Sequence, residues 1–181
     1  MRRILILDDE SAVLNALRRA LRSAFPMEAV VIETFDEPEA AVHRAGEQDF
    51  DVVISDYRMP GLNGADVLQL VKGLQPDAVR IVVSASTESG DIIAAVNRAE
   101  VFRYLAKPWQ HEELIGTVRE AFGRRDSAML GKPGRPPAHG PEVEADHLAL
   151  GLQQIELEHL ELEEPGTARV EWDEHGNIRL V

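Results

Sequence analysis

Short apolar runs alternate with longer amphipathic stretches from about residue 3 to about residue 125. The short runs are rich in Val, Ile and Leu and end in polar or turn-forming residues, which is typical of strands buried on both faces. In the longer stretches, apolar residues recur every three or four positions, which predicts helices with one buried side. We therefore predict five strands, at residues 3–7, 29–34, 51–55, 79–83 and 101–105, each followed by a helix.

Capping residues and prolines set the expected helix ends. Ser11 is expected to cap the first helix, which continues to about Phe25 before Pro26, and Asp36 to cap the second, with Pro38 in its first turn. The remaining helices are expected near residues 65–73, after residues 89–90, and from about residue 109 to residue 125. Regular alternation of strands and helices predicts an α/β fold: a doubly wound parallel sheet with helices on both faces.

The composition changes after residue 126. Residues 127–145 contain a stretch rich in Pro and Gly, which predicts a linker. Residues 146–164 favour a helix, although residues 155–158 also alternate as a strand would. Residues 169–172 and 177–180 flank Gly176 and predict a β-hairpin. We thus divide the chain into a domain at 1–126, a linker at 127–145 and a small appendage at 146–181.

The appendage is expected to need a packing partner. An isolated hairpin is only marginally stable in water, so it must pack on the preceding helix, on the first domain or on a second chain. The predicted helix contains apolar residues at the spacing of a short coiled-coil seam: Leu148, Leu152, Ile155 and Leu162. A homodimer formed through this tail is therefore one hypothesis.

Charge and composition limit the classes of partner. The net charge is -13, with 15 basic and 21 acidic residues in 1–126 and 4 basic and 11 acidic residues in 127–181. Neither part offers the basic face that binding to a phosphate backbone requires, which argues against nucleic acid as a partner. The chain has no cysteine, no apolar run long enough to span a bilayer and no signal-peptide pattern at its start, so we expect a cytoplasmic protein without a membrane partner.

Chemically active side chains follow four of the predicted strands. Asp8 and Asp9 follow the first strand, Asp56 the third, Ser84 the fourth and Lys107 the fifth. Taken singly, the acids and Ser84 could be cap or turn residues and Lys107 a solvated charge. In a doubly wound sheet, however, these strand ends meet at one crevice.

Three carboxylates at one crevice repel each other unless a cation joins them. Oxygen ligands of this kind suit Mg²⁺. A carboxylate nucleophile, a dication, an ammonium group and a hydroxyl donor are the parts needed to transfer a phosphoryl group to an aspartate. The sequence therefore predicts phosphoryl chemistry at this edge of the sheet.

Residues 1–126 resemble the receiver domain of response regulators in two-component signalling. The matching motifs are Asp8-Asp9, Asp56 followed by Met59-Pro60-Gly61 and Gly64, Ser84-Ala85, and Lys107-Pro108. The resemblance implies a flavodoxin-like sheet with strand order 2-1-3-4-5. It also implies a signalling protein rather than an enzyme, with only slow hydrolysis of its own aspartyl phosphate.

The resemblance also assigns roles to single residues. It implies that Asp56 accepts a phosphoryl group from a sensor histidine kinase or a phosphotransfer protein. It implies a Mg²⁺ site formed by Asp8, Asp9, Asp56 and the backbone carbonyl of Arg58. Lys107 would pair with the phosphoryl oxygens, and Ser84 and Tyr104 would form a switch that responds to phosphorylation.

The output of such a protein is less clearly marked in the sequence. The 55 residues after residue 126 are too few for a typical winged-helix domain and contain no recognised output motif. Our first hypothesis is a receiver that signals through phosphorylation-dependent contacts with an unknown downstream protein. The alternative is a transcriptional regulator with a minimal DNA-binding tail.

Overall fold

The computed structural model describes residues 1–85, 99–130, 170–172 and 178–180. The chain divides into two compact units, Met1–Glu144 and Ala145–Val181, and each is described by itself. None of the described helices is long and apolar enough to cross a bilayer.

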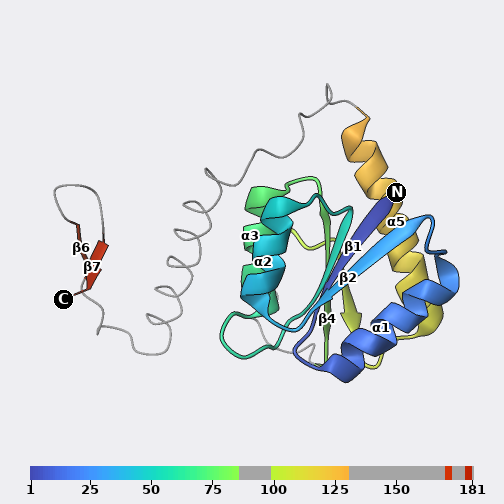
Figure 1. The fold of residues 1–181 in the computed structure, drawn as a ribbon, viewed down its shortest axis with the longest axis horizontal. Helices are drawn as coiled ribbons and strands as arrows, with labels where there is room; N and C mark the ends of the chain where they lie inside the picture. The colour runs from blue at the N-terminus through green and yellow to red at the C-terminus, as the bar shows by residue number, and fades with distance from the viewer. Residues whose placement is uncertain (86–98, 131–169, 173–177, 181) are drawn as a thin grey trace. The chain divides into compact units, whose positions relative to one another are not determined.

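The first unit contains a five-stranded sheet in the order β2-β1-β3-β4-β5, in which every neighbouring pair is parallel. This confirms the predicted flavodoxin-like topology. Helices α1 and α5 cover one face of the sheet and α2 and α3 the other (Figure 1). The elements in chain order are β1 (Arg2–Leu7), α1 (Ser11–Ala24), β2 (Val30–Phe35), α2 (Pro38–Glu47), β3 (Val52–Asp56), α3 (Gly64–Leu74), β4 (Val79–Ser84), β5 (Arg103–Ala106) and α5 (His111–Met129).

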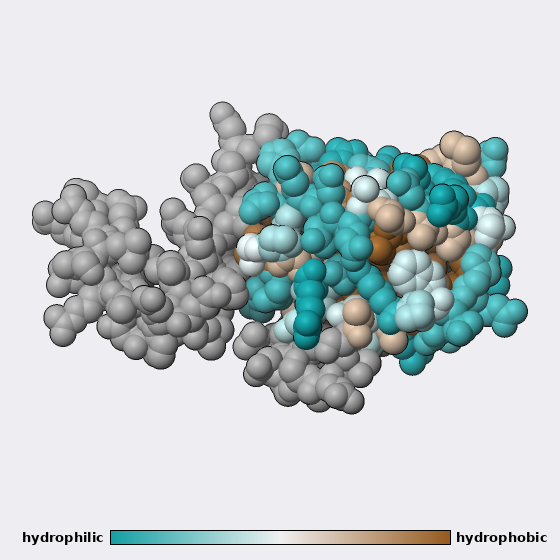
Figure 2. Space-filling view, turned by 90° about the horizontal axis from the view of Figure 1, so that it is seen from below, coloured by the Kyte–Doolittle hydropathy of each residue, from teal (hydrophilic) through white to brown (hydrophobic). Residues whose placement is uncertain are grey.

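The apolar runs form the centre of the molecule. Residues 4–7, 52–54 and 81–83 have no solvent exposure, because helices cover both faces of the sheet. On the α1 and α5 side, Leu17, Leu21 and Val118 pack against alternate strand residues. The surface seen in Figure 2 is mostly hydrophilic, with smaller hydrophobic areas between the polar residues. Burial of these runs supplies the main driving force for the fold.

Three helix ends differ from the prediction. The first helix begins at Ser11 itself with Glu10 as its N-cap, and the second begins at Pro38 with Glu37 as its N-cap. Neither cap makes a side-chain hydrogen bond, so the expected caps at Ser11 and Asp36 are wrong. Helix α5 continues to Met129, four residues past the expected end, because residues 126–129 include no helix breaker. The helix expected after residues 89–90 lies outside the described residues.

The second unit contains the predicted strand pair. Strands β6 (Val170–Trp172) and β7 (Ile178–Leu180) are antiparallel, and Glu171 lies opposite Arg179. The linker predicted at 127–145 overlaps the end of α5 at residues 127–129. Its part from residue 131 onward, the helix predicted at 146–164 and the coiled-coil seam of that helix lie outside the described residues. Those three predictions remain untested.

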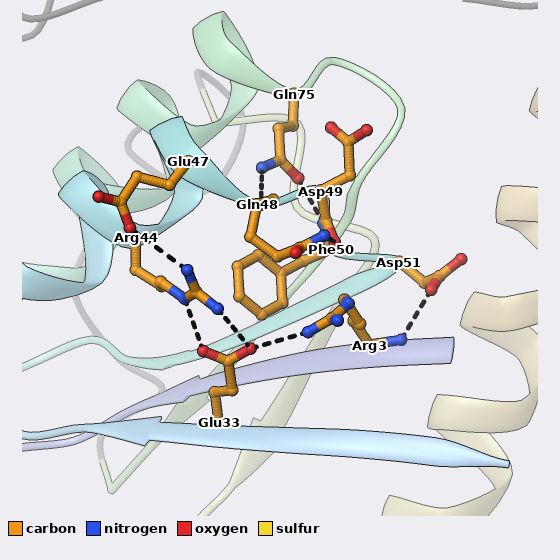
Figure 3. Close-up of polar contacts among 9 residues, drawn as sticks. All are labelled: Arg3, Glu33, Arg44, Glu47, Gln48, Asp49, Phe50, Asp51 and Gln75. Atoms are coloured by element: carbon orange, nitrogen blue, oxygen red, sulfur yellow. Dashed lines mark hydrogen bonds and ion pairs between the residues drawn. The ribbon is translucent and has the colours of Figure 1, made fainter. Parts of the chain in front are cut away.

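A buried amide joins α3 to the turn before β3. Gln75, at the end of α3, is 3% exposed, and its Oε1 accepts a hydrogen bond from the backbone N–H of Phe50 at 2.7 Å. Its Nε2 donates to the carbonyl of Gln48 (Figure 3) and also to the carbonyl of Ala45. One side chain therefore satisfies three backbone groups that no strand or helix pairs.

A neighbouring ion-pair network joins β1, β2 and α2. Glu33 on β2 accepts from Arg3 at 3.1 Å and from Arg44 at 2.7 Å, and Arg44 also pairs with Glu47 (Figure 3). The Asp51 carboxylate accepts from the backbone N–H of Arg3 at 2.8 Å. These contacts stabilise the end of the sheet at which β1 and β3 begin.

The Gln75 contacts predict a large loss of stability on truncation. Gln75→Ala should lower the free energy of unfolding by about 3 kcal/mol, because a buried N–H, a buried carbonyl and a partly buried carbonyl lose their partner. The measurement is urea unfolding followed by circular dichroism. Gln110→Ala, which removes an exposed glutamine at the start of α5, should change stability by less than about 0.5 kcal/mol. Equal midpoints for the two variants would contradict the role given to Gln75.

Candidate functional site

The four predicted strand ends meet at one edge of the sheet. Asp8 directly follows β1, Asp56 ends β3, Ser84 ends β4 and Lys107 directly follows β5. Because these four strands are neighbours in a parallel sheet, their carboxyl ends lie side by side. The fold thus brings together residues that are up to 99 positions apart in sequence.

Three carboxylates form a cluster at this edge. One oxygen each of Asp8, Asp9 and Asp56 can be chosen so that all lie within 4.8 Å of one another. Asp8 is fully buried, Asp56 is 6% exposed and Asp9 is exposed. Three hard oxygen ligands, one of them open to water, fit a cation such as Mg²⁺ that retains part of its hydration shell.

Lys107 reduces the repulsion between the two buried acids. Its Nζ lies 2.7 Å from Oδ2 of Asp8 and 3.0 Å from Oδ1 of Asp56. Burial lowers the pKa of Lys107, but the hydrogen bonds to Asp8 and Asp56 outweigh burial and hold the pKa above its usual value. The ammonium group therefore stays charged between the two carboxylates.

The surroundings of Asp56 disfavour the ionised form of its carboxyl group. Burial raises the pKa of its carboxyl, the hydrogen bond and charge of Lys107 lower it only in part, and the charge of Asp8 raises it further. A carboxylate whose charge is poorly compensated gains from an added cation or from bonding to an electrophile. This environment suits a nucleophilic oxygen.

The start of α3 packs directly behind Asp56. The backbone N–H of Gly64 donates to the carbonyl of Tyr57 at 2.9 Å. A Cβ atom at Gly64 would collide with the backbone oxygen of Asp56, so only glycine fits here. Asn63 caps the helix, because its Oδ1 accepts from the N–H groups of Ala65 and Asp66. The small size of Gly64 and the cap at Asn63 together set how closely the start of α3 approaches β3.

Ser84 and Tyr104 lie on neighbouring strands. Ser84 is 1% exposed, and its backbone carbonyl accepts from the N–H of Lys107 at 2.8 Å and from the hydroxyl of Tyr104 at 3.2 Å. Tyr104 is half-buried. The Tyr104 side chain is therefore hydrogen-bonded to the main chain of Ser84, the residue with which it is predicted to form a switch.

The predicted site residues are thus partly joined by direct contacts. Asp8, Asp9, Asp56 and Lys107 come together, and Ser84 and Tyr104 are connected through the Ser84 carbonyl. Arg58 follows in the loop after β3, with an exposed side chain. The sequence-based prediction gave no role to Ser55, although a hydroxyl in an otherwise apolar strand is a signal for one.

Comparison with protein families identifies the first unit. Residues 4–119 match the family of the response regulator receiver domain. The chain belongs to this family. The predicted resemblance is therefore confirmed.

Curated relatives of this receiver are transcriptional regulatory proteins by name. The hydrogenase transcriptional regulatory protein HoxA of Cupriavidus necator is 42% identical over 118 residues, which are 65% of this chain and 23% of HoxA. The transcriptional regulatory protein KdpE of Mycobacterium tuberculosis is 34% identical over 149 residues, 82% of this chain and 60% of KdpE. The chain thus spans less than two thirds of the length of either relative.

Solved structures agree with the fold. The signal receiver domain of an HD domain-containing protein from Pseudomonas fluorescens Pf-5 has a TM-score of 0.67 at 26% identity, covering 72% of this chain and 93% of that chain. A CheY-like receiver domain protein from Methanospirillum hungatei has a TM-score of 0.65 at 21% identity, covering 71% of this chain and 98% of that chain. The second likeness concerns the fold alone.

The contact between Gly64 and Asp56 predicts opposite effects of one substitution at two glycines of α3. Gly64→Ala should lower the free energy of unfolding by about 2 kcal/mol or more, because the added methyl group forces α3 away from β3. Gly73→Ala is the matched control, since nothing lies within 4 Å of the position that its methyl group would take, and it should gain about 0.5 kcal/mol. Thermal unfolding of both variants is the measurement. A neutral Gly64→Ala would mean that the close approach does not exist.

Proposed function

We propose that this receiver accepts a phosphoryl group on Asp56 from a sensor histidine kinase or a phosphotransfer protein. The observation that carries the proposal is the position of the Asp56 carboxylate. It is buried at the carboxyl end of β3, within the reach of two further carboxylates and 3.0 Å from the Lys107 ammonium. Membership of the receiver family supports the same reaction.

The proposed transfer uses few groups. One Asp56 carboxylate oxygen attacks the phosphorus atom of the donor, and the bond from phosphorus to the donor nitrogen breaks. Lys107 then pairs with a phosphoryl oxygen while remaining close to Asp8, so that negative charge is neutralised where it accumulates. The Ser84 hydroxyl would donate to another phosphoryl oxygen.

The cation we propose for this site is Mg²⁺. Asp8, Asp9 and Asp56 would hold it together with the backbone carbonyl of Arg58, and the exposure of Asp9 leaves room for water ligands. When bound, Mg²⁺ would neutralise the charge of the incoming phosphoryl group. Beyond slow hydrolysis of the aspartyl phosphate, the proposal includes no enzymatic activity.

The proposed output is a change in protein contacts. The hydrogen bond from Tyr104 to the Ser84 carbonyl links the phosphorylation site to the surface of β5. If Ser84 moves when Asp56 is phosphorylated, Tyr104 must adjust, and a partner that binds one arrangement better will shift the equilibrium. The appendage at 146–181 is proposed as a second contact element, for a downstream protein or a second copy of the chain.

Transcriptional control is the second candidate function. It is favoured by the names of the relatives, HoxA and KdpE. Most of HoxA and part of KdpE lie outside the match to this chain, however, and residues 127–181 carry 11 acidic against 4 basic residues. Because that charge opposes contact with a phosphate backbone, direct DNA binding ranks second.

The phosphoacceptor assignment predicts loss of labelling at one residue. Wild-type protein incubated with acetyl phosphate and Mg²⁺ should gain one phosphoryl group by intact mass spectrometry, and Asp56→Asn should gain none. Asp36→Asn, an exposed acid outside the site, should label as wild type does. Labelling of Asp56→Asn at the wild-type level would place the acceptor elsewhere.

The cation site predicts that stability depends on Mg²⁺. In chelator-treated protein, free Mg²⁺ at a hundred times the dissociation constant should add about 2.7 kcal/mol of stability. Asp9→Ala should raise that dissociation constant at least about tenfold, since the cation loses a direct ligand, while the metal-free midpoint changes little because Asp9 is exposed. Thermal unfolding at increasing Mg²⁺ measures both quantities. Glu10→Ala, the adjacent exposed acid, is the control, and equal Mg²⁺ curves for the two variants would remove Asp9 from the site.

A further inference from the structure

One buried hydroxyl beside the site has no role in the proposed transfer. Ser55 has no solvent exposure and follows the apolar residues 52–54 in β3. Burying a hydroxyl without a partner costs stability, so its hydrogen bond matters. The Oγ of Ser55 donates to the backbone carbonyl of Asp56 at 2.8 Å. The hydroxyl therefore acts on the main chain of the proposed phosphoacceptor.

The sheet explains why that carbonyl needs a side-chain donor. Pairing of β3 with β1 ends at Ser55, opposite Leu7, whereas pairing with β4 continues to Asp56. The Asp8 N–H, the next along the chain, lies on the side of β1 that faces β2 and donates to the Phe35 carbonyl at 3.1 Å. The Asp56 carbonyl thus lies past the last residue of β3 that is paired with β1, and the Ser55 hydroxyl supplies its hydrogen bond.

Gly64 limits the space beside the same carbonyl. A Cβ atom at Gly64 would collide with the Asp56 oxygen and lie 2.7 Å from Oγ of Ser55. Position 64 therefore requires glycine, and the Ser55 hydroxyl and Gly64 together confine the carbonyl. The Gly64 N–H then holds the next carbonyl, that of Tyr57, at 2.9 Å.

We propose that Ser55 is a positioning residue for phosphoryl transfer: its hydroxyl fixes the peptide plane between Asp56 and Tyr57. The inference rests on the proposed function of Asp56. Rotation of this plane would shift the Asp56 carboxylate on one side and the chain leading to Arg58 on the other. Loss of the hydroxyl should therefore weaken Mg²⁺ binding and slow phosphoryl transfer together.

The test compares Ser55→Ala with Thr117→Val, which removes a buried hydroxyl from α5. With Mg²⁺ and acetyl phosphate both saturating, Ser55→Ala should label about fivefold more slowly, and its Mg²⁺ dissociation constant should rise about fivefold, as expected for one lost hydrogen bond. Thr117→Val should alter only the unfolding midpoint. Ser55→Ala that folds, labels and binds Mg²⁺ as wild type does overturns the proposal, and so does an equal loss in Thr117→Val.

A readout independent of activity separates this inference from the proposed function. Hydrogen exchange of the Gly64 amide, followed by NMR in chelator, should be faster in Ser55→Ala and unchanged in Thr117→Val. If wild-type protein takes up phosphoryl groups at a residue other than Asp56, the proposed function fails, whereas the exchange rate and Mg²⁺ affinity still decide whether Ser55 holds the Asp56 main chain. An unchanged exchange rate of the Gly64 amide in Ser55→Ala would directly contradict the proposal that Ser55 fixes the main chain of Asp56.

Discussion

The ammonium of Lys107 between Asp8 and Asp56 is the interaction on which the candidate site depends. Two carboxylates buried side by side repel each other, and each loses hydration that the protein must replace. Contacts of 2.7 and 3.0 Å to one charged lysine offset part of that cost. Burial nevertheless keeps the pKa of Asp56 raised, and three carboxylates beside one ammonium group leave the site with an excess of negative charge. That excess charge is consistent with the proposed dication and the proposed phosphoryl transfer.

The second constraint is the close packing behind Asp56. Gly64 brings the start of α3 against the main chain of β3, and Ser55 donates a hydrogen bond to the carbonyl beyond the end of the β1 pairing. These contacts involve main-chain atoms, so they restrict the direction in which the Asp56 side chain leaves the strand. The proposed nucleophile must be held accurately to react, and a packed strand and helix hold it better than a free loop does.

At the opposite edge of the sheet, polar contacts serve stability. Gln75 satisfies three backbone groups before β3, and Glu33 joins Arg3 and Arg44 across three elements. The two ends of the sheet therefore differ in role. Contacts at the amino ends of the strands fix where the strands begin, whereas the carboxyl ends carry the charged side chains of the candidate site. Such a division is typical of open parallel sheets, in which ligands bind at the carboxyl ends of strands.

The amino-acid sequence was enough to predict the strands, their parallel arrangement and the residues at their ends, because buried strands and amphipathic helices leave distinct apolar patterns. It misplaced the caps of α1 and α2 and the end of α5, since helix ends depend on local contacts that a pattern of apolar residues does not record. The contact of Lys107 with Asp8 across 99 positions could be seen only in the folded chain, and so could the packing of Gly64 and Ser55 around the Asp56 carbonyl. Those contacts join residues on different elements, and their distances follow from how strand and helix pack, which no single stretch of sequence specifies.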